Sequence, residues 1–310
     1  MHGLFLEDCQ RNNMPKVSSI TYRRIFCKEY NFSFFKPKKD QCMTCSEYEK
    51  AAPEERTKLE QKYQMHLERK DAAMKEKEAD KQRATDENGF ISISCDMQSV
   101  LHIPTSEISL LYYLRKLNLY NFTIYESAPP NDAFCYFWTE VNGKRGSCEI
   151  GTCLSLYIQS LTENRKNVMH LTIFSDTCGG QNRNIQVAAV LLHTVQCHPT
   201  LDVIEQKFME SGHSYMEVDS MHSSIETAKH KIDIFSVHEY ENIFRMARKN
   251  RKGDKSAYKT REIEHNEFLD LKKLAQMMII NKNKDFEGNT VNWLNVKCFR
   301  YQKQLPNVIQ

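Results

Sequence analysis

The sequence predicts an α/β protein built on a mixed five-stranded sheet with helices on both faces, preceded by a helical N-terminal region. Three β-rich segments come first without a helix between them, and helices then alternate with further strands. The 310 residues are enough for one large domain or two smaller ones. The net charge is only +3, so a nucleic-acid-binding surface would have to be local.

The order of the expected elements suggests a specific topology. The first segment alternates apolar and small polar residues, and the next two are rich in aromatic and β-branched residues, which is typical of strands. We expect strands at 89–101, 118–126 and 132–141, a helix at 147–161, a strand at 167–174, a helix at 184–196, a strand at 201–210 and a helix at 214–231. Three antiparallel strands followed by βαβ units form the ribonuclease H-like arrangement.

The composition divides the chain into four regions. They are a helical region at 1–50 with a C-x-x-C pair, a charged helix at 51–88, the ribonuclease H-like domain at 89–240, and a basic and helical extension at 241–310. Residues 54–87 carry charges of both signs and only a thin apolar seam, so we expect a long solvated helix, either a coiled-coil arm or a plain spacer. Residues 4–12 and 21–39 together suggest a helix-turn-helix remnant that lacks the turn glycine.

Acidic side chains fall where the expected strands end and the expected helices begin. Asp96 ends the first strand, and Asp176 follows the fourth, which is its neighbour in the expected sheet. Asp219 lies on the helix after the fifth strand, and Glu149 opens the helix after the third. Sites in open α/β sheets lie beyond the carboxyl ends of parallel strands, so we expect these four carboxylates to converge on one edge.

Clustered carboxylates repel one another unless a cation lies among them. Their hard oxygen atoms suit Mg²⁺ or Mn²⁺, and two such ions can clamp the attacking and leaving oxygens of an in-line phosphoryl displacement. Glu226 competes with Asp219 for the third position, but it lies roughly 10 Å further along the helix, so we favour Asp219. His222 lies three residues after Asp219 and could also reach the site.

The stretch "FSDTCGGQNRN", residues 174–184, surrounds Asp176 with a flexible corner and hydrogen-bonding side chains. Gly179 and Gly180 would let the backbone approach a phosphate or turn sharply. The polar side chains that follow could contact DNA sugar, phosphate or base edges, and they are Gln181, Asn182, Arg183 and Asn184. A single Asp in such a position is equally well explained as a helix cap or a turn residue.

Cys42 and Cys45 have zinc-knuckle spacing and follow the basic turn "KPKKD". A zinc site needs two more ligands, for which His66 is the first candidate and Cys27 a more distant one. The alternative is a pair of ordinary reduced thiols. A redox pair is disfavoured, because no βαβ pattern surrounds these cysteines.

A second local concentration of charge lies at residues 244–255. Its basic side chains could track a phosphate backbone or act in nuclear import, although a solvated loop explains them as well, and they include Arg248, Lys249, Arg251 and Lys252. The first residues form no apolar core of signal-peptide length, and no run approaches the roughly 18 apolar residues of a membrane span. We therefore expect an intracellular, nuclear protein that does not enter a membrane.

The motif around Asp176 resembles the "SDxCGGQNxN" signature of a family of transposon-derived proteins common in insects, which are similar to DDE/D transposases with a ribonuclease H-like core. The resemblance covers most of the chain, including "KPKKDQCMTC" (36–45), "CDMQSVL" (95–101), "RGSCEIGTCL" (145–154) and "GHSYMEVDSMHSSIE" (212–226). It implies Asp96, Asp176 and Asp219 as metal ligands and His213 as a ligand or phosphate contact. A strand-end His can also be a simple cap. Such a family member would run further, so we expect a truncated or repurposed copy.

Three functions are compatible with these patterns. The first is a transposase that uses two Mg²⁺ or Mn²⁺ ions for DNA strand cleavage and strand transfer, with water or a 3′-hydroxyl as nucleophile. The second is a domesticated DNA-binding protein without catalysis. A ribonuclease H-type nuclease is the third and weaker alternative, because a zinc-binding N-terminal region suits DNA targeting better. The expected partner is DNA, and self-association into a homo-oligomer is left open.

Overall fold

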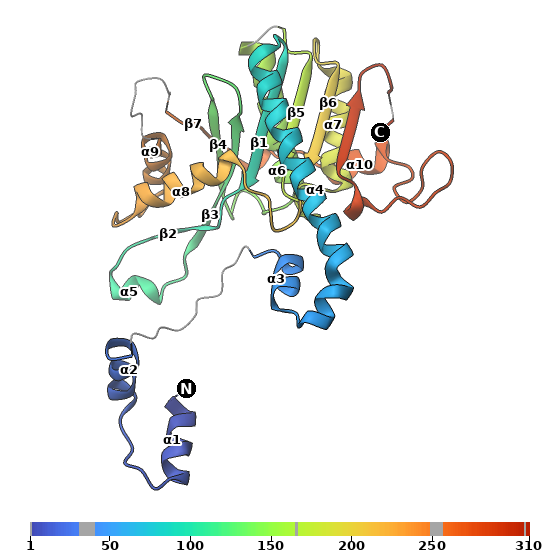
Figure 1. The fold of residues 1–310 in the computed structure, drawn as a ribbon. Helices are drawn as coiled ribbons and strands as arrows, with labels where there is room; N and C mark the ends of the chain where they lie inside the picture. Colours follow the sequence, from blue (N-terminus) through green and yellow to red (C-terminus); the bar gives the residue numbers. More distant parts are fainter. Residues whose placement is uncertain (1, 31–40, 165–166, 249–256, 307) are drawn as a thin grey trace. The chain divides into compact units, whose positions relative to one another are not determined.

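The computed structural model describes residues 2–30, 41–164, 167–248, 257–306 and 308–310, and the side chains of 162–164 are left out (Figure 1). The chain forms two compact units, Met1–Gln41 and Cys42–Gln310. The boundary falls directly before Cys42, so the C-x-x-C pair belongs to the larger unit.

Within residues 2–30, the described part of the first unit, lie the helices α1 (His2–Arg11) and α2 (Ser19–Lys28). The side chain of Ser18 caps α2 by accepting a hydrogen bond from the backbone N–H of Thr21. Phe5 and Tyr22 pack their rings together with centroids 5.1 Å apart. The helical character expected for the start of the chain is therefore confirmed for these described residues.

The second unit is an α/β domain on one mixed eight-stranded sheet. Its strands are β1 (Phe90–Met97), β2 (Leu101–Ile103), β3 (Leu117–Glu126), β4 (Ala133–Thr139), β5 (His170–Ser175), β6 (Val203–Phe208), β7 (Lys259–Glu262) and β8 (Cys298–Gln302). Its helices are α3 (Met43–Lys50), α4 (Pro53–Asp86), α5 (Ser109–Tyr112), α6 (Ser147–Asn164), α7 (Ile185–Cys197), α8 (Glu217–Lys229), α9 (Val237–Ala247) and α10 (Leu271–Met278), with short 3₁₀ turns η1 (His265–Glu267) and η2 (Trp293–Asn295).

The strands follow the order β7-β4-β3-β1-β5-β6-β8, and β2 pairs with β3. Among the five expected strands, β3 is antiparallel to both β1 and β4, whereas β5 is parallel to β1 and β6. The prediction of five strands was incomplete. The expected first strand splits into β1 and β2, β7 adds to β4 in parallel, and β8 adds to β6 antiparallel.

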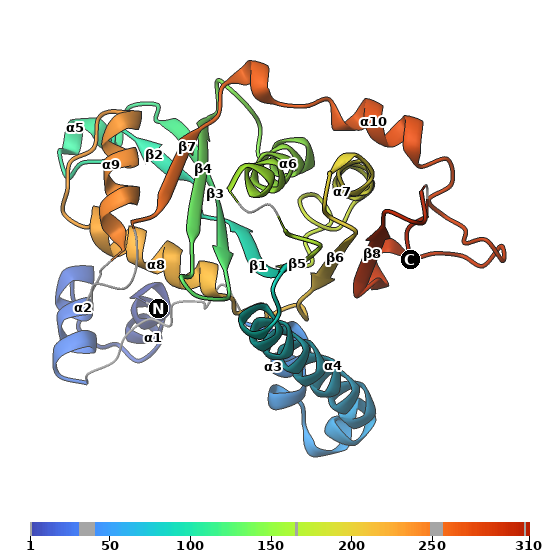
Figure 2. The ribbon, with the colours of Figure 1, turned by 90° about the horizontal axis from the view of Figure 1, so that it is seen from above.

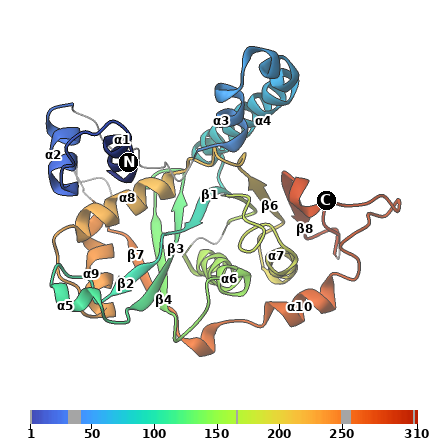
Figure 3. The same ribbon diagram turned by 90° about the horizontal axis from the view of Figure 1, so that it is seen from below.

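Helices cover both faces of this sheet (Figures 2 and 3). Helices α6, α7 and α10 lie on one face, and α4, α8 and α9 lie on the other. Successive side chains of β1 point to opposite faces of the sheet, where two separate cores lie. Ile93 and Cys95 pack under α6 and α7, while Ser94 points to the opposite face. The expected helices on both faces are confirmed.

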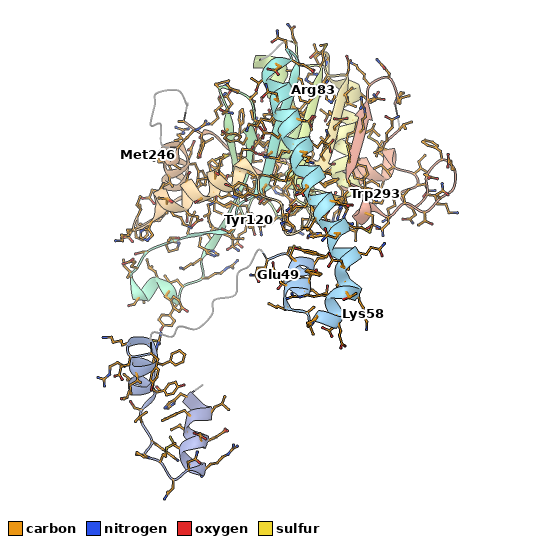
Figure 4. All side chains as sticks on the ribbon, in the orientation of Figure 1. Glu49, Lys58, Arg83, Tyr120, Met246 and Trp293 are labelled. Atoms are coloured by element: carbon orange, nitrogen blue, oxygen red, sulfur yellow. The ribbon has the colours of Figure 1, made fainter. Side chains whose placement is uncertain are left out.

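Helix α4 is long and charged, as expected, but it is not a free arm. Its later turns lie along the sheet, where Lys77 pairs with Glu217 at 2.7 Å and Asp80 with Lys207 at 2.8 Å. The guanidinium of Arg83, labelled in Figure 4, stacks 4.1 Å from the ring centroid of Phe90. These buried ion pairs fix one face of α4 to the domain.

Candidate functional site: a carboxylate cluster and a Cys/His cluster

The register of two parallel strands brings Asp96 and Asp176 to the same level of the sheet. Ser94 on β1 pairs with Phe174 on β5, and the two aspartates lie two residues further along each strand. Asp96 points to the face of α8, because its neighbour Cys95 packs into the opposite core. Neighbouring strands are about 4.8 Å apart, so the expected meeting of these residues at the carboxyl edge follows from the pairing.

Helix α8 brings two further groups to this edge. Ligand atoms of Asp96, Asp219 and His222 all lie within 4.8 Å of one another. Asp219 lies in the first turn of α8, and its Oδ2 accepts a 2.7 Å hydrogen bond from the backbone N–H of Met216. This bond fixes the carboxylate at the start of the helix, close to the strand ends. These three groups form the carboxylate cluster.

The carboxylates of this cluster repel one another electrostatically when no cation lies between them. The pKa of Asp96 is raised from 3.8 to about 7, first by burial and then by the negative charges of Asp176 and Asp219, with Arg145 opposing the shift. Burial lowers the pKa of His222 to about 4, and Arg145 lowers it further. At neutral pH the imidazole is therefore uncharged and gives these carboxylates no compensating charge.

Asp176 is not one of the three residues of the carboxylate cluster, but its negative charge acts on Asp96. Its Oδ1 accepts hydrogen bonds from the backbone N–H of Cys178 at 3.1 Å and from Nδ2 of Asn182 at 2.6 Å. Its effect on the pKa of Asp96 shows that it lies nearby. That Asp176 binds a metal ion together with Asp96 stays a prediction.

The donor atoms at this edge suit a hard divalent cation. Carboxylate oxygens are the ligands that Mg²⁺ and Mn²⁺ take in proteins, and two ligands on one such ion lie at most about 4.2 Å apart. Ligand atoms of Asp96 and Asp219 lie within 4.8 Å of each other, which is close to that limit. A cation there would also reverse the repulsion that raises the pKa of Asp96.

A second cluster joins residues that lie far apart in the sequence. Cys42 caps the N-terminus of α3, Cys45 lies in its first turn, His66 lies on α4, and His213 lies in the loop between β6 and α8. Their ligand atoms lie within 4.8 Å of one another. Sγ of Cys42 is 3.1 Å from Nε2 of His66, and Sγ of Cys45 is 3.2 Å from Nε2 of His213. We call these four residues the Cys/His cluster.

A buried carboxylate supports the Cys/His cluster from behind. Oε1 of Glu210 lies 3.1 Å from Nδ1 of His66, which leaves Nε2 of that ring directed at the cysteine. Lys297 binds the other carboxylate oxygen at 2.7 Å, and Arg69 lies 3.4 Å from Oε1. Metal-binding histidines commonly donate their second nitrogen to a carboxylate in this way. The four residues could therefore hold a metal ion, with Glu210 as the outer partner of His66.

The glycine before His213 is required by close packing. Gly212 has φ +77°, a conformation that L side chains rarely adopt. A Cβ at this position would lie 2.6 Å from Cα and 2.7 Å from Cβ of Cys42. The glycine thus lets the loop that carries His213 pass directly against the start of α3.

The surroundings of the Cys/His cluster favour the neutral forms of Cys45 and His213. Burial and the neighbouring Cys42 raise the pKa of Cys45. Burial lowers the pKa of His213, and the charge of His66 lowers it further. A metal ion would bind the deprotonated thiols and neutral imidazoles, so the four donors fit a thiophilic divalent cation.

Residues 128–303 match the family described as domain of unknown function DUF7869, and this segment is more than half of the chain. The protein belongs to the DUF7869 family. No curated protein and no solved structure gives a significant match. The DUF7869 segment includes Asp176, His213 and Asp219, but it begins after Asp96 and after the C-x-x-C pair. Neither cluster is therefore complete within the DUF7869 segment alone.

Two expected catalytic residues lie elsewhere. Glu149 caps its own helix, since its carboxylate oxygens accept hydrogen bonds from the backbone N–H groups of Lys144 at 3.0 Å and Gly146 at 3.2 Å. It is not among the three grouped residues of the carboxylate cluster. The structure places His213 with Cys42, Cys45 and His66 rather than with Asp96 and Asp219, so it is the fourth side chain of the Cys/His cluster.

The amides after Asp176 build the corner rather than a DNA-binding surface. Asn182 is buried and donates to Asp176, and its backbone carbonyl accepts from Gln206 at 2.9 Å. Arg183 is buried and donates to the carbonyl of Val296 at 3.1 Å. Asn184 caps α7 through Oδ1. Asn182 and Arg183 are therefore buried structural residues, whereas the half-buried Gln181 and Asn184 stay candidate contacts.

The basic segment is described only in part. The guanidinium of Arg248 lies 5.8 Å from the ring of Tyr125 and 5.5 Å from the ring of Tyr258, and it donates to the carbonyl of Asn131 at 2.6 Å. It thus has a packing role in addition to any contact with DNA. The other three predicted DNA contacts lie outside the described residues, and they are Lys249, Arg251 and Lys252.

Sequence analysis gave no role to two residues that lie at these sites, Arg145 and Glu210. Arg145 is exposed and donates to the backbone carbonyls of Met97 and Gln98 at 3.4 and 3.0 Å, which puts a positive charge beside Asp96. Glu210 directly precedes the "SGH" turn, and its position between a strand end and His213 was the available signal for an outer partner. Arg145 offered no comparable signal.

Proposed function

We propose that this chain is a transposase-derived protein whose ribonuclease H-like core performs, or descends from an enzyme that performed, metal-dependent phosphoryl transfer on DNA. The observation that carries the proposal is the grouping of Asp96 and Asp219 within 4.8 Å, together with the charge of Asp176, at the carboxyl edge of the sheet. Carboxylates that crowd together repel one another, and metal-dependent active sites require this arrangement because the bound cation offsets the repulsion.

The strand order supports the proposed core. The strands β4-β3-β1-β5-β6 correspond to the order 3-2-1-4-5 of the five expected strands, with the second antiparallel to both of its neighbours. The three acidic residues come from the first strand, from the end of the fourth and from the helix after the fifth. That is the distribution the resemblance to DDE/D transposases implies.

Each residue of the carboxylate cluster would have a defined role in the reaction. Asp96, Asp176 and Asp219 would hold divalent ions, which when bound stabilise the charge on the attacking and leaving oxygens. Arg145 is exposed and lies beside Asp96, and its guanidinium would orient a DNA phosphate by charge-assisted hydrogen bonds. Water would serve as nucleophile for cleavage and a 3′-hydroxyl for strand transfer.

For the Cys/His cluster we propose Zn²⁺ in a structural role. Two thiolates and two imidazoles form a closed tetrahedral set, and atoms bound to one zinc at about 2.3 Å for sulfur and about 2.0–2.1 Å for nitrogen would lie about 3.6 Å apart. The observed separations of 3.1 and 3.2 Å between sulfur and nitrogen are close to that value. Such an ion would fasten α3 and α4 to the loop that leads into α8.

We also propose DNA as the partner and the nucleus as the location, on the basis of the transposon-derived resemblance and the basic segment. Self-association into a homo-oligomer is compatible with this proposal. Within the described residues, no helix is both long and apolar enough to cross a bilayer.

The test is cleavage of supercoiled plasmid by the full chain with Mg²⁺ or Mn²⁺, beside Asp176→Asn and the matched control Glu226→Gln. We expect nicking that Asp176→Asn reduces about a thousandfold and that the control retains. DNA binding without cleavage would favour the domesticated binding protein, and cleavage confined to RNA–DNA hybrids would favour the ribonuclease H-type nuclease. Absence of both binding and cleavage would refute the proposal.

A further inference from the structure

His222 places an imidazole beside the two carboxylates of the carboxylate cluster. It lies three residues after Asp219 on α8, so both side chains point to the same side of the helix. One of its two ring nitrogens lies within 4.8 Å of ligand atoms of both Asp96 and Asp219. An imidazole among oxygen ligands changes which metal the site prefers.

The hydrogen bonds of Thr123 determine which nitrogen of His222 carries the proton. The hydroxyl of Thr123 donates to the backbone carbonyl of Asp96 at 3.1 Å, and this uses its single proton. The hydroxyl oxygen lies 2.7 Å from Nε2 of His222, so Nε2–H must be the donor of that bond. Nδ1 then keeps the lone pair, and Thr123 holds the ring in the tautomer that a metal-binding histidine needs.

We propose that His222 binds the divalent ion through Nδ1, which makes this an Asp-Asp-His site that selects Mn²⁺ over Mg²⁺. The inference rests on the proposed function, because it concerns the same metal site. Mg²⁺ demands near-ideal octahedral oxygen coordination, whereas imidazole suits first-row transition ions. Thr123 is a positioning residue in this account, since it acts through the ring of His222.

A competing explanation is that His222 only accepts a hydrogen bond from a protonated Asp96. The low pKa of His222, caused by burial, agrees with either role, because the ring is neutral in both. The two explanations differ in whether nitrogen contacts the metal. Spectroscopy can answer this without any turnover.

The experiment uses the full chain loaded with one equivalent of zinc, so that the Cys/His cluster is filled before Mn²⁺ is added. Pulsed electron paramagnetic resonance of the Mn²⁺-bound protein should show a nitrogen coupling, and labelling histidine with ¹⁵N should change its frequencies. His222→Asp should remove the coupling. It should also lower the ratio of Mn²⁺ affinity to Mg²⁺ affinity at least about tenfold, because the loss of an outer partner of a metal ligand already costs that much in metal affinity. Glu226→Gln, on the same helix, should leave both unchanged.

Labelling the unmutated protein makes the test independent of whether His222→Asp folds. Mn²⁺ binding that depends on Asp96 but shows no histidine coupling would overturn the role of His222 and leave the proposed function intact. A coupling that persists in folded His222→Asp would assign the nitrogen to another histidine and overturn the inference as well. Absence of any Mn²⁺ binding by the zinc-loaded protein would contradict both the inference and the proposed function.

Discussion

Replacement of Asp96 by Asn should stabilise the protein in the absence of Mg²⁺ and Mn²⁺. The pKa of Asp96 is about 7 in the folded protein against 3.8 for an exposed carboxyl, because of burial and of the charges of Asp176 and Asp219. The folded state therefore holds this proton more tightly than the unfolded chain does. Ionisation of Asp96 thus opposes folding, and Asn keeps the shape of the side chain without the charge.

The size of this effect depends on pH in a defined direction. Below about pH 4 the carboxyl is protonated in both states and costs nothing. Between about pH 4 and pH 7 the unfolded chain releases the proton first, so stability falls by about 1.4 kcal/mol per pH unit. Above pH 7 the loss is constant, at an upper limit of about 4 kcal/mol for a shift of about three units. The advantage of Asp96→Asn should follow the same curve.

Urea unfolding of the zinc-loaded protein at several pH values would measure this. We expect Asp96→Asn to match the wild type near pH 4 and to exceed it by a few kcal/mol near pH 8, with the exposed control Asp202→Asn showing no such trend. Mn²⁺ should remove the deficit of the wild type and leave Asp96→Asn unaffected. Equal stability of wild type and Asp96→Asn at pH 8 would show that the carboxylates are not crowded as described.

Three further results are expected. Gly212→Ala should lower the free energy of unfolding by at least about 1–2 kcal/mol, the cost of a left-handed backbone for an L residue, and it should weaken zinc binding, because the new Cβ would collide with the start of α3. Gly180→Ala is the control: no atom lies within 4 Å of its new Cβ, so urea unfolding should show no change in stability. Metal analysis should find one zinc per chain, which His213→Ala loses on mild chelation; retention of that zinc would remove His213 from the ligands. Asp219→Asn should abolish Mn²⁺ binding in calorimetry while Glu226→Gln retains it, and the reverse pattern would exchange their roles.

Much of the fold could be predicted because its signals are local. Alternating and β-rich segments gave the five central strands, and the helix over 54–87 followed from its charge pattern. Strands β7 and β8 are short and partly polar, and they complete the sheet only by pairing with β4 and β6. Their residues carry little independent strand signal, so tertiary pairing rather than propensity decides their conformation.

The candidate sites could be predicted where reactive side chains lie at strand ends or at a fixed spacing in the sequence. That logic brought Asp96 and Asp219 to one edge, where the structure also groups them, and the C-x-x-C pair pointed to a metal with His66. The sequence did not show that His213 meets Cys45, because the folded loop between β6 and α8 brings these two residues together. Amides such as Asn182 resemble a binding surface in sequence, but burial gives them structural roles.

The rate of DNA strand cleavage by Asp96→Asn tests the central claim most directly. Single-turnover nicking of plasmid by the zinc-loaded full chain would be measured with saturating Mn²⁺, and DNA affinity would be measured in the same samples. We predict that wild type cleaves and that Asp96→Asn binds DNA equally but cleaves about a thousandfold more slowly. Cleavage by Asp96→Asn at the wild-type rate would contradict the assignment of this edge of the sheet as a metal-dependent active site.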